Sequence, residues 1–328
     1  MAIGTALIGC IRTMAHKIAP LSFRRDRVWS KFGTRLADGA SIEEWTSTAG
    51  FDFELKSTGV QYTPFPEDWP KGFRGRFVQY NSKTLAPLAI TTTRHRTVQL
   101  RDVMKLFRQA TEAYDCRLEF ASVLQQGRKC FVLASTTREA RILDDLHKQY
   151  LLLTITCDEL PIICAELLTL RDACANTIRE IIYKKNKSRA KSGYVMRFDV
   201  EHVITSLGSI DFDRSFKEHL RQLEKLICVS ITAEEAKKFF AELLSPYKAE
   251  QFLANGHTIR GLDNMYQSYL YAIGACPGTL YGMLQGVTFY VDNVCKSRDK
   301  DATIWSLLFG KGAQMKDLAY KRLVNMAK

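Results

Sequence analysis

A run of six lysines and arginines without an acidic residue lies at positions 184–197, between Tyr183 and Phe198. Cations in such a run can hold the phosphates of a nucleic acid, while neighbouring aromatic rings stack on its bases. Gly193 interrupts the run, and the apolar residues after it are typical of a strand. The segment therefore predicts a site for a polyanion. Its candidate contact residues are Lys184, Lys185, Lys187, Arg189, Lys191, Tyr194 and Arg197.

Basic runs also occur on solvated surface loops, where they only keep a protein soluble. Two features of this chain favour binding instead: its formal net charge is +12, and basic residues recur in three other places, two of them around aromatic residues. One group surrounds Trp29 and Phe32, and another surrounds Phe73 and Phe77. The basic residues are Arg24, Arg25, Arg27, Lys31 and Arg35; Lys71, Arg74 and Arg76; and Arg94, Arg96 and Arg101. We add Arg94, Arg96, Arg101, Arg171 and Asn176 to the candidate nucleic-acid surface.

No group of residues forms a recognisable catalytic site. The chain has no GxxxxGK[ST] phosphate loop, and its six histidines include no HxxxH, HExxH or HxH pair, so we expect neither a cofactor nor a metal. Acidic pairs could serve a two-metal nuclease, although they are more typical of hydrophilic turns. The pairs are Asp144 with Asp145 and Asp299 with Asp301. A second hypothesis is therefore a metal-dependent nuclease or antirestriction factor with Asp158, Asp144 and Asp145 as ligands.

Composition sets the class of protein. The chain has 328 residues, of which 46% are hydrophobic and 25% charged, which is typical of a globular protein with a large core. The longest apolar stretch is interrupted by acidic residues and is shorter than the roughly 20 residues of a membrane span, so we expect no membrane contact. Nine cysteines form no CxxC pair, which favours a reducing compartment. We expect a cytoplasmic protein.

Two hairpins and a helix are expected in the first 200 residues. Strands at 74–80 and 85–92 are joined by turn residues at 81–83, and strands at 118–124 and 130–135 are joined at 125–127. A 3.6-residue period predicts a helix over 98–114 between the hairpins, and a capping box at Ser41 begins a short helix before it. Apolar stretches at 151–157 and 164–170 predict buried strands. Residues 172–176 are interpreted as leading into a helix.

After Asp199 the pattern becomes helical, with helices expected at 213–226, 232–244, 262–273, 279–294 and 303–327. The predicted fold class is α+β: an antiparallel sheet built from hairpins with a crossing helix, followed by a C-terminal helical layer. We divide the chain into an N-terminal extension at 1–13, a mixed sheet and helix core at 14–200, and a helical region at 201–328 packed on that core. No linker separates the last two, so they are expected to form one continuous domain.

The order of several motifs resembles a family of phage/plasmid-like proteins that carry a domain of unknown function. The motifs are Met14-Ala15-His16, Trp29-x-x-x-Gly33-Thr34, Ala49-Gly50-Phe51, Arg94-His95-Arg96-Thr97-Val98-Gln99, Gly127-Arg128, the strand from Tyr150, Arg171-x-x-Cys174-x-Asn176-Thr177, Gly278-Thr279-x-Tyr281-Gly282, Tyr290-Val291-Asp292 and Phe309-Gly310-x-Gly312-Ala313-x-x-Lys316. The chain departs from the family pattern at Leu100, Gln285 and Asn293. The resemblance implies a mobile-element protein in a bacterial host cytoplasm and leaves the activity open.

The expected order of a hairpin, a helix and further antiparallel sheet is similar in outline to that of the single-strand annealing proteins of phage recombination. Those proteins form oligomeric rings with DNA in a basic groove. By this fold-level analogy we expect an ATP-independent, non-catalytic protein that binds single-stranded DNA, forms a homo-oligomeric ring or filament, and works with a partner exonuclease. A third hypothesis is a non-enzymatic structural factor whose basic surface meets an acidic protein.

Overall fold

The computed structural model describes residues 34–37, 39–93, 97–143, 145–157, 162–171, 176–184, 211–246, 249, 259–295 and 297–328, with backbone alone for 162–164 and 176–184. The chain has an α+β fold with two antiparallel sheets, and its C-terminal helices follow the strands. The predicted fold class is confirmed.

The larger sheet has six antiparallel strands. In spatial order they are β1 (Thr34–Arg35), β5 (Arg117–Leu124), β6 (Lys129–Ile142), β7 (Asp145–Thr156), β8 (Ile162–Arg171) and β9 (Asn176–Lys184). From β5 onward, each strand pairs with the next one along the chain. Its central strands bury both faces: Phe131 and Leu133 contribute to one core, whereas Val132 and Ala134 contribute to the other. Burial on both faces explains the uninterrupted apolar runs in these strands.

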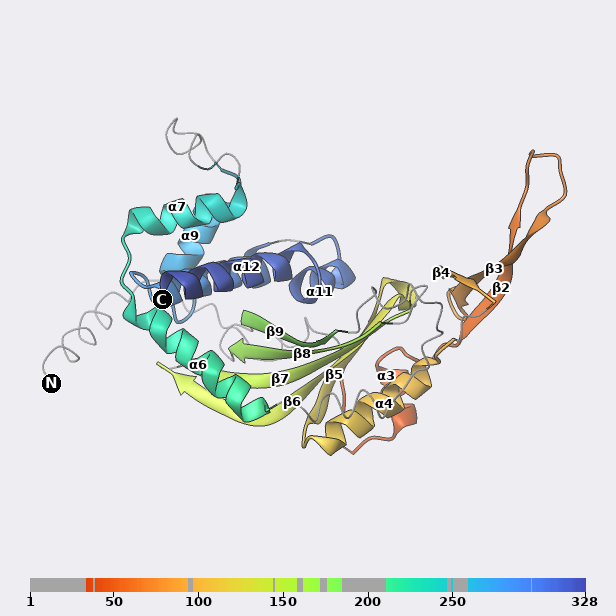
Figure 1. Cartoon of the computed structure of the whole chain (residues 1–328), viewed down its shortest axis with the longest axis horizontal. Helices are drawn as coiled ribbons and strands as arrows, with labels where there is room; N and C mark the ends of the chain where they lie inside the picture. Colours follow the sequence, from red (N-terminus) through yellow and green to blue (C-terminus); the bar gives the residue numbers. More distant parts are fainter. Residues whose placement is uncertain are drawn as a thin grey trace, which may run out of the picture.

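Helices cover the two faces of this sheet, as Figure 1 shows. On one face lie α3 (Ile42–Thr48) and α4 (Leu100–Ala113), which share a core with Leu151 and Leu153. The other face is covered by the C-terminal helices, whose core includes Leu152 and Tyr281. These helices are α6 (Phe212–Cys228), α7 (Ala233–Leu244), α9 (Leu262–Tyr271), α10 (Leu280–Phe289), the π-helix η4 (Tyr290–Val294), α11 (Lys300–Leu308) and α12 (Lys311–Met326).

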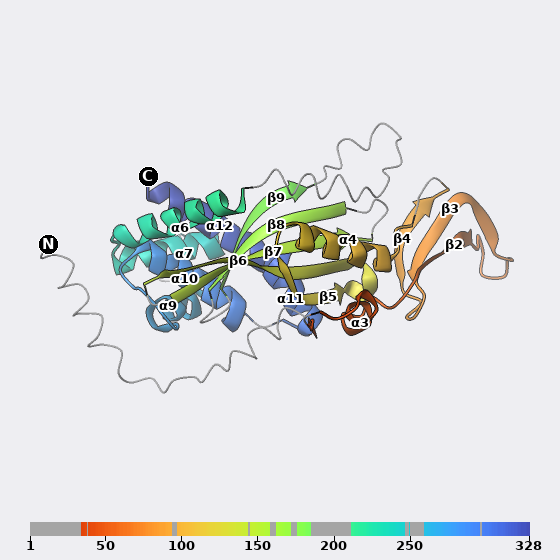
Figure 2. The same ribbon diagram turned by 90° about the horizontal axis from the view of Figure 1, so that it is seen from below.

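The smaller sheet projects from this assembly (Figures 1 and 2). Its strands, in spatial order, are β2 (Leu55–Tyr62), β3 (Lys71–Asn81) and β4 (Pro87–Thr92). We call residues 55–92 the arm and the rest of the described structure the body. The root of the arm is tied to the body: Asn81 Nδ2 donates to Gln126 O at 2.9 Å, and Leu55 N donates to Gln99 Oε1 at 3.0 Å.

Local signals predicted most of these elements. Both expected hairpins form, as β3 with β4 and β5 with β6, and the short 3₁₀ turn η2 (Gln125–Gly127) joins the second pair. The capping boxes at Ser41 and Thr232 are present, each closed by a glutamate three residues later. The strands expected at 151–157 and 164–170 lie within β7 and β8, which pair with each other.

Two predictions about elements were wrong, and the extension of two strands was not predicted. Residues 172–176 do not lead into a helix, since β9 begins at Asn176 and pairs with β8. The single helix expected over 303–327 is two helices, because the amides of Phe309 and Gly310 both bond to Trp305 O and close α11. Finally, β6 and β7 extend through a polar stretch that was not predicted as strand, where pairs such as Glu139 with Lys148 continue the ladder.

None of the helices within the described residues is both long and apolar enough to cross a membrane.

Candidate nucleic-acid interface

The strongest predicted binding segment lies almost entirely outside the described residues. Lys184 is the last residue of β9, the strand at one edge of the six-stranded sheet, and its backbone pairs with Cys164. The basic run therefore begins at the rim of the sheet. Its other candidate residues, together with two of the upstream arginines, lie outside the described residues: Lys185, Lys187, Arg189, Lys191, Tyr194, Arg197, Arg94 and Arg96.

Arg101 lies on the exposed side of α4. Its guanidinium forms an ion pair with Glu43 from α3, and both side chains are more than half exposed. An exposed pair of this kind contributes little to stability, and the arginine can exchange its carboxylate for a phosphate. Asn176 begins β9, and its backbone pairs with Arg171 on β8.

Arg171 is placed differently from a surface cation, because its side chain is only 1% exposed. Its guanidinium forms an ion pair with Asp145 of β7 and donates to Gln285 Oε1 of α10 at 3.0 Å. Gly274 allows this approach, since a Cβ at that position would lie 1.6 Å from Nη2 of the arginine. We assign Arg171 a structural role that joins the sheet to the helical layer. Asp145, a metal ligand in the nuclease hypothesis, belongs to the same buried network.

Two histidines, one buried and one half-buried, lie on the same side of the sheet. His147 of β7 lies opposite Arg171 in the register and 3.3 Å from the hydroxyl of Tyr281. Burial, with smaller contributions from the charges of Arg171 and His219, lowers the pKa of His147 to about 3, and burial lowers the pKa of His219 to about 4. Both rings are therefore neutral at pH 7. These histidines support packing and are not cationic contacts.

The C-terminal motifs also have a structural explanation. Lys316 Nζ of α12 donates to Asp292 Oδ1 of η4 at 2.6 Å, and each side chain is 3% exposed. Two motif glycines allow close packing: a Cβ at Gly282 would lie 1.9 Å from Cys276 O, and one at Gly312 would lie 2.8 Å from Ser306 O. The motifs that carried the family resemblance in this region thus hold the helical layer together.

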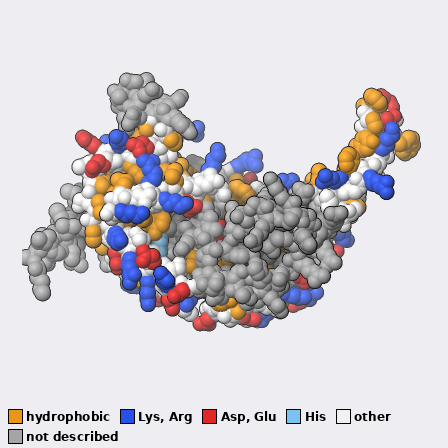
Figure 3. All heavy atoms as spheres, viewed as in Figure 1, with side chains coloured by type: hydrophobic (Ala, Val, Ile, Leu, Met, Phe, Trp, Pro, Cys, Tyr) orange, Lys and Arg blue, Asp and Glu red, His pale blue; other side chains and the backbone are white. Residues whose placement is uncertain are grey.

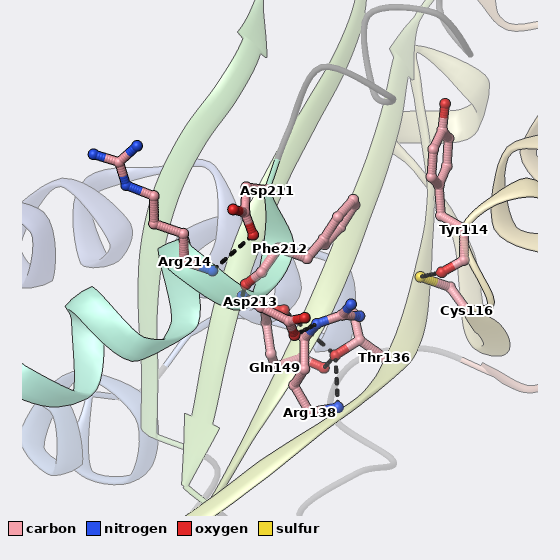
Figure 4. Close-up of polar contacts among 9 residues, drawn as sticks. All are labelled: Tyr114, Cys116, Thr136, Arg138, Gln149, Asp211, Phe212, Asp213 and Arg214. Carbon is pink, nitrogen blue, oxygen red and sulfur yellow. Dashed lines mark hydrogen bonds and ion pairs between the residues drawn. The ribbon is translucent and has the colours of Figure 1, made fainter.

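The first turn of α6 is anchored to the sheet and to the end of α4 (Figure 4). The ring of Phe212 stacks on that of Tyr114, with centroids 6.0 Å apart. The guanidinium of Arg138 also lies over the ring of Phe212, 5.3 Å from its centroid. Arg138 Nε also donates to Asp213 Oδ1 at 2.5 Å. Nearby, burial raises the pKa of the Cys116 thiol to about 11, so this cysteine is not a reactive thiolate. The chain therefore returns to the sheet at a fixed point after residue 210.

The second basic and aromatic group lies on the arm and is exposed to solvent. Figure 3 shows hydrophobic and basic side chains along this projection, with acidic side chains near its far end. Lys71, Phe73, Arg74 and Arg76 belong to β3, and all four are exposed. Within the described residues, Lys71 and Arg74 form no ion pair. This surface combines cations that phosphates can approach with aromatic rings.

Three aromatic residues in and beside the loop between β2 and β3 are not among the residues that the sequence analysis singled out. These are Tyr62, Phe65 and Trp69, which are 49%, 67% and 88% exposed. The available signal was the spacing of aromatic residues between Pro64, Pro66 and Pro70, since prolines restrict the backbone of a loop.

Metal chemistry receives no support from the described side chains. Within the part of the chain that the structure describes, no three His, Cys, Asp or Glu residues lie close enough to hold a metal ion. Asp299 caps α11 by accepting from Ala302 N at 2.7 Å, and Asp301 accepts from Gln125 N at 2.9 Å. Asp144 and Asp158 lie outside the described residues.

Comparison with known proteins gives one match. The sequence model of a protein family described as "Domain of unknown function (DUF932)" matches residues 87–308, more than half of the chain. The match begins at the first residue of β4 and ends at the last residue of α11, so it includes β5–β9 and leaves out β2 and β3. Neither the curated proteins nor the solved structures contain a match to this chain.

Proposed function

Because this chain belongs to the family that carries the domain of unknown function DUF932, and that description assigns no activity, we propose a function from the chain's own residues. The protein binds and anneals single-stranded DNA without ATP. The setting we propose is recombination in a phage or plasmid, in the cytoplasm of a bacterial host, with the protein acting as a homo-oligomeric ring or filament beside a partner exonuclease.

One observation carries this proposal. Six lysines and arginines without an acid occupy positions 184–197, and the first of them ends the edge strand of the sheet. An edge strand has no neighbouring strand on one side, so the start of the run at Lys184 suits contact with an extended polyanion. Annealing needs two strands held by their backbones with base edges free, so phosphate contacts should dominate and sequence preference should be weak.

The first experiment measures binding of the full chain to labelled single- and double-stranded oligonucleotides by fluorescence polarisation over a salt series. The test variant carries alanine at Lys184, Lys185, Lys187 and Lys191. The matched control removes the same charge from four exposed lysines of the helices, Lys217, Lys225, Lys238 and Lys321. Each lost phosphate contact should reduce the log–log salt slope by about 0.7 for a single strand, so the test variant should show a much flatter slope than the control.

Annealing is measured next, as the rate at which two complementary oligonucleotides with donor and acceptor dyes pair without ATP. We expect the wild-type protein to accelerate pairing and the four-lysine variant to lose most of that effect. Equal DNA affinity and equal salt slope for the test and control variants would remove the basic run from the proposal. Absence of any nucleic-acid binding at low salt would refute the function itself.

A further inference from the structure

Folding does not explain the exposed aromatic residues of the arm. Three of its aromatic side chains stay largely in solvent: Trp69 is 88% exposed, Phe65 67% and Phe73 54%. Apolar surface stabilises a fold only when it leaves water, so these rings add little to the stability of the arm. A cluster of exposed aromatic residues on one projection instead marks a binding surface.

The arm holds these rings in a defined arrangement. Tyr62 and Phe73 form an edge-to-face pair with centroids 6.3 Å apart. The amide of Asp68 donates to Phe65 O at 3.0 Å and closes a turn in the loop between β2 and β3. That loop also contains three prolines, which reduce its conformational freedom. A prearranged loop loses little entropy when a ligand binds.

An irregularity in β3 places cations beside the rings. Gly59 pairs with Phe77, and Gln61 pairs with Gly72, so residues 73–76 of β3 lie opposite Val60 alone. The extra length forms a bulge at Gly75, whose φ is +75°, a conformation that glycine adopts without strain. Two arginines, Arg74 and Arg76, flank this glycine. The bulge thus exposes both of them next to Phe73.

The order of residue types along β3 supports one class of ligand. Sheet-type RNA-binding modules present stacking rings on a strand with the order lysine, glycine, aromatic, and then aromatic, valine, any residue, aromatic. Strand β3 has a similar order in Lys71-Gly72-Phe73 and Phe77-Val78-x-Tyr80. The strand departs from that order by the two arginines at the bulge. It is also the middle strand of the arm sheet.

We propose that the arm is a single-stranded nucleic-acid platform, in which Phe65, Trp69 and Phe73 stack on bases while Lys71, Arg74 and Arg76 contact phosphates. This inference rests on the proposed function and assigns it a second, separate binding site. The acids Glu67 and Asp68 lie in the loop between β2 and β3. Their charge repels phosphates, so the backbone of the bound strand is kept near the cations and its bases are directed to the rings.

The test compares two kinds of arm variant, using labelled 20-residue oligonucleotides of thymidine and of uridine and the full chain. Removal of rings in Phe65→Ala/Trp69→Ala should weaken binding about tenfold or more per ring without changing the salt slope, because stacking releases no counterions. Removal of charge in Lys71→Ala/Arg74→Ala should reduce the slope by about 0.7 per contact. Trp69→Phe should retain most of the affinity, since phenylalanine keeps a stacking face.

The control is Tyr271→Ala, which removes an aromatic residue that is 61% exposed on α9 of the body. The platform would be overturned if the ring variant bound the oligonucleotides as tightly as this control does. If the wild type binds in the same experiment and the four-lysine variant does not, the proposed function still stands. A change of molar mass in light scattering, with unchanged affinity, would also overturn the platform and identify a second copy of the chain as the partner of the arm. A difference in affinity between the thymidine and the uridine oligonucleotide shows whether the arm prefers DNA or RNA.

Discussion

The six-stranded sheet of the body and the three-stranded sheet of the arm are both antiparallel, but they differ in what covers them. The body sheet has a helical layer on each face, and its central side chains are buried in two cores. The arm is covered only at its root, where Leu55 and Leu88 are buried, and its far end exposes aromatic side chains. In the body, apolar residues are explained by burial. At the far end of the arm, the exposed aromatic residues need another explanation, and binding is the one that their exposure favours.

The family match includes most of the body and one strand of the arm. It covers β5–β9 of the large sheet, most of the helices and β4, and it leaves out β1, β2 and β3. The motif residues within the body are mostly packing devices, such as the buried Arg171 and the close approach at Gly282. Belonging to the family therefore accounts for most of the architecture of the body and does not extend to β2, β3 and the loop between them.

The largest effect expected is on the buried ion pair of the helical layer. Lys316→Ala leaves Asp292 charged and buried without its partner, which typically costs about 3–5 kcal/mol. Urea unfolding followed by circular dichroism measures this loss. The matched control is Lys321→Ala on the exposed side of the same helix, where a change of at most about 0.5 kcal/mol is expected. Similar losses in the two variants would show that the helical layer does not depend on this pair.

Short-range signals were sufficient for most of the body. The 3.6-residue period of α4, the capping boxes at Ser41 and Thr232, and the turns of two hairpins are local properties, and each formed as predicted. Strand β9 was missed because Asn176 and Thr177 also suit a turn or a cap. What makes this segment a strand is its backbone pairing with β8, and tertiary pairing of that kind is not visible in a local window.

The candidate site was predicted less completely for a different reason. Sequence identifies a residue's charge but not its depth, so Arg171 was grouped with surface cations although it lies in a buried network. Conversely, β2 was not predicted, since most of it is polar and it is exposed on both faces. Without β2, the loop at 64–70 had no supporting strand, and Trp69 and Phe65 could not be recognised as the end of a projection.

A smaller effect is expected from acid, and it should act on the body because residues 55–92 contain no histidine. Burial lowers the pKa of His147 from 6.5 to about 3. Between these two pH values the unfolded chain binds a proton that the folded chain does not, so stability is lost as the pH falls below 6.5. At pH 5 this histidine alone should cost about 2 kcal/mol. Urea unfolding at pH 7 and pH 5 measures the difference, and His147→Gln should reduce it; an equal loss in that variant would assign the acid sensitivity to other groups.

The smallest effect is expected at the end of the arm, and it separates the arm from the body most directly. Replacing residues 62–71 by Asn-Gly, a sequence that favours a tight hairpin turn, removes Phe65 and Trp69, which are exposed in the folded chain and therefore bury almost nothing. The free energy of unfolding should change by no more than about 0.5 kcal/mol. Leu55→Ala at the buried root should cost about 2–5 kcal/mol, because Leu55 is 5% exposed and belongs to the core beneath α4. If the shortened arm instead lost as much stability as the root variant, its rings would be holding the fold, and their exposure would no longer favour a ligand.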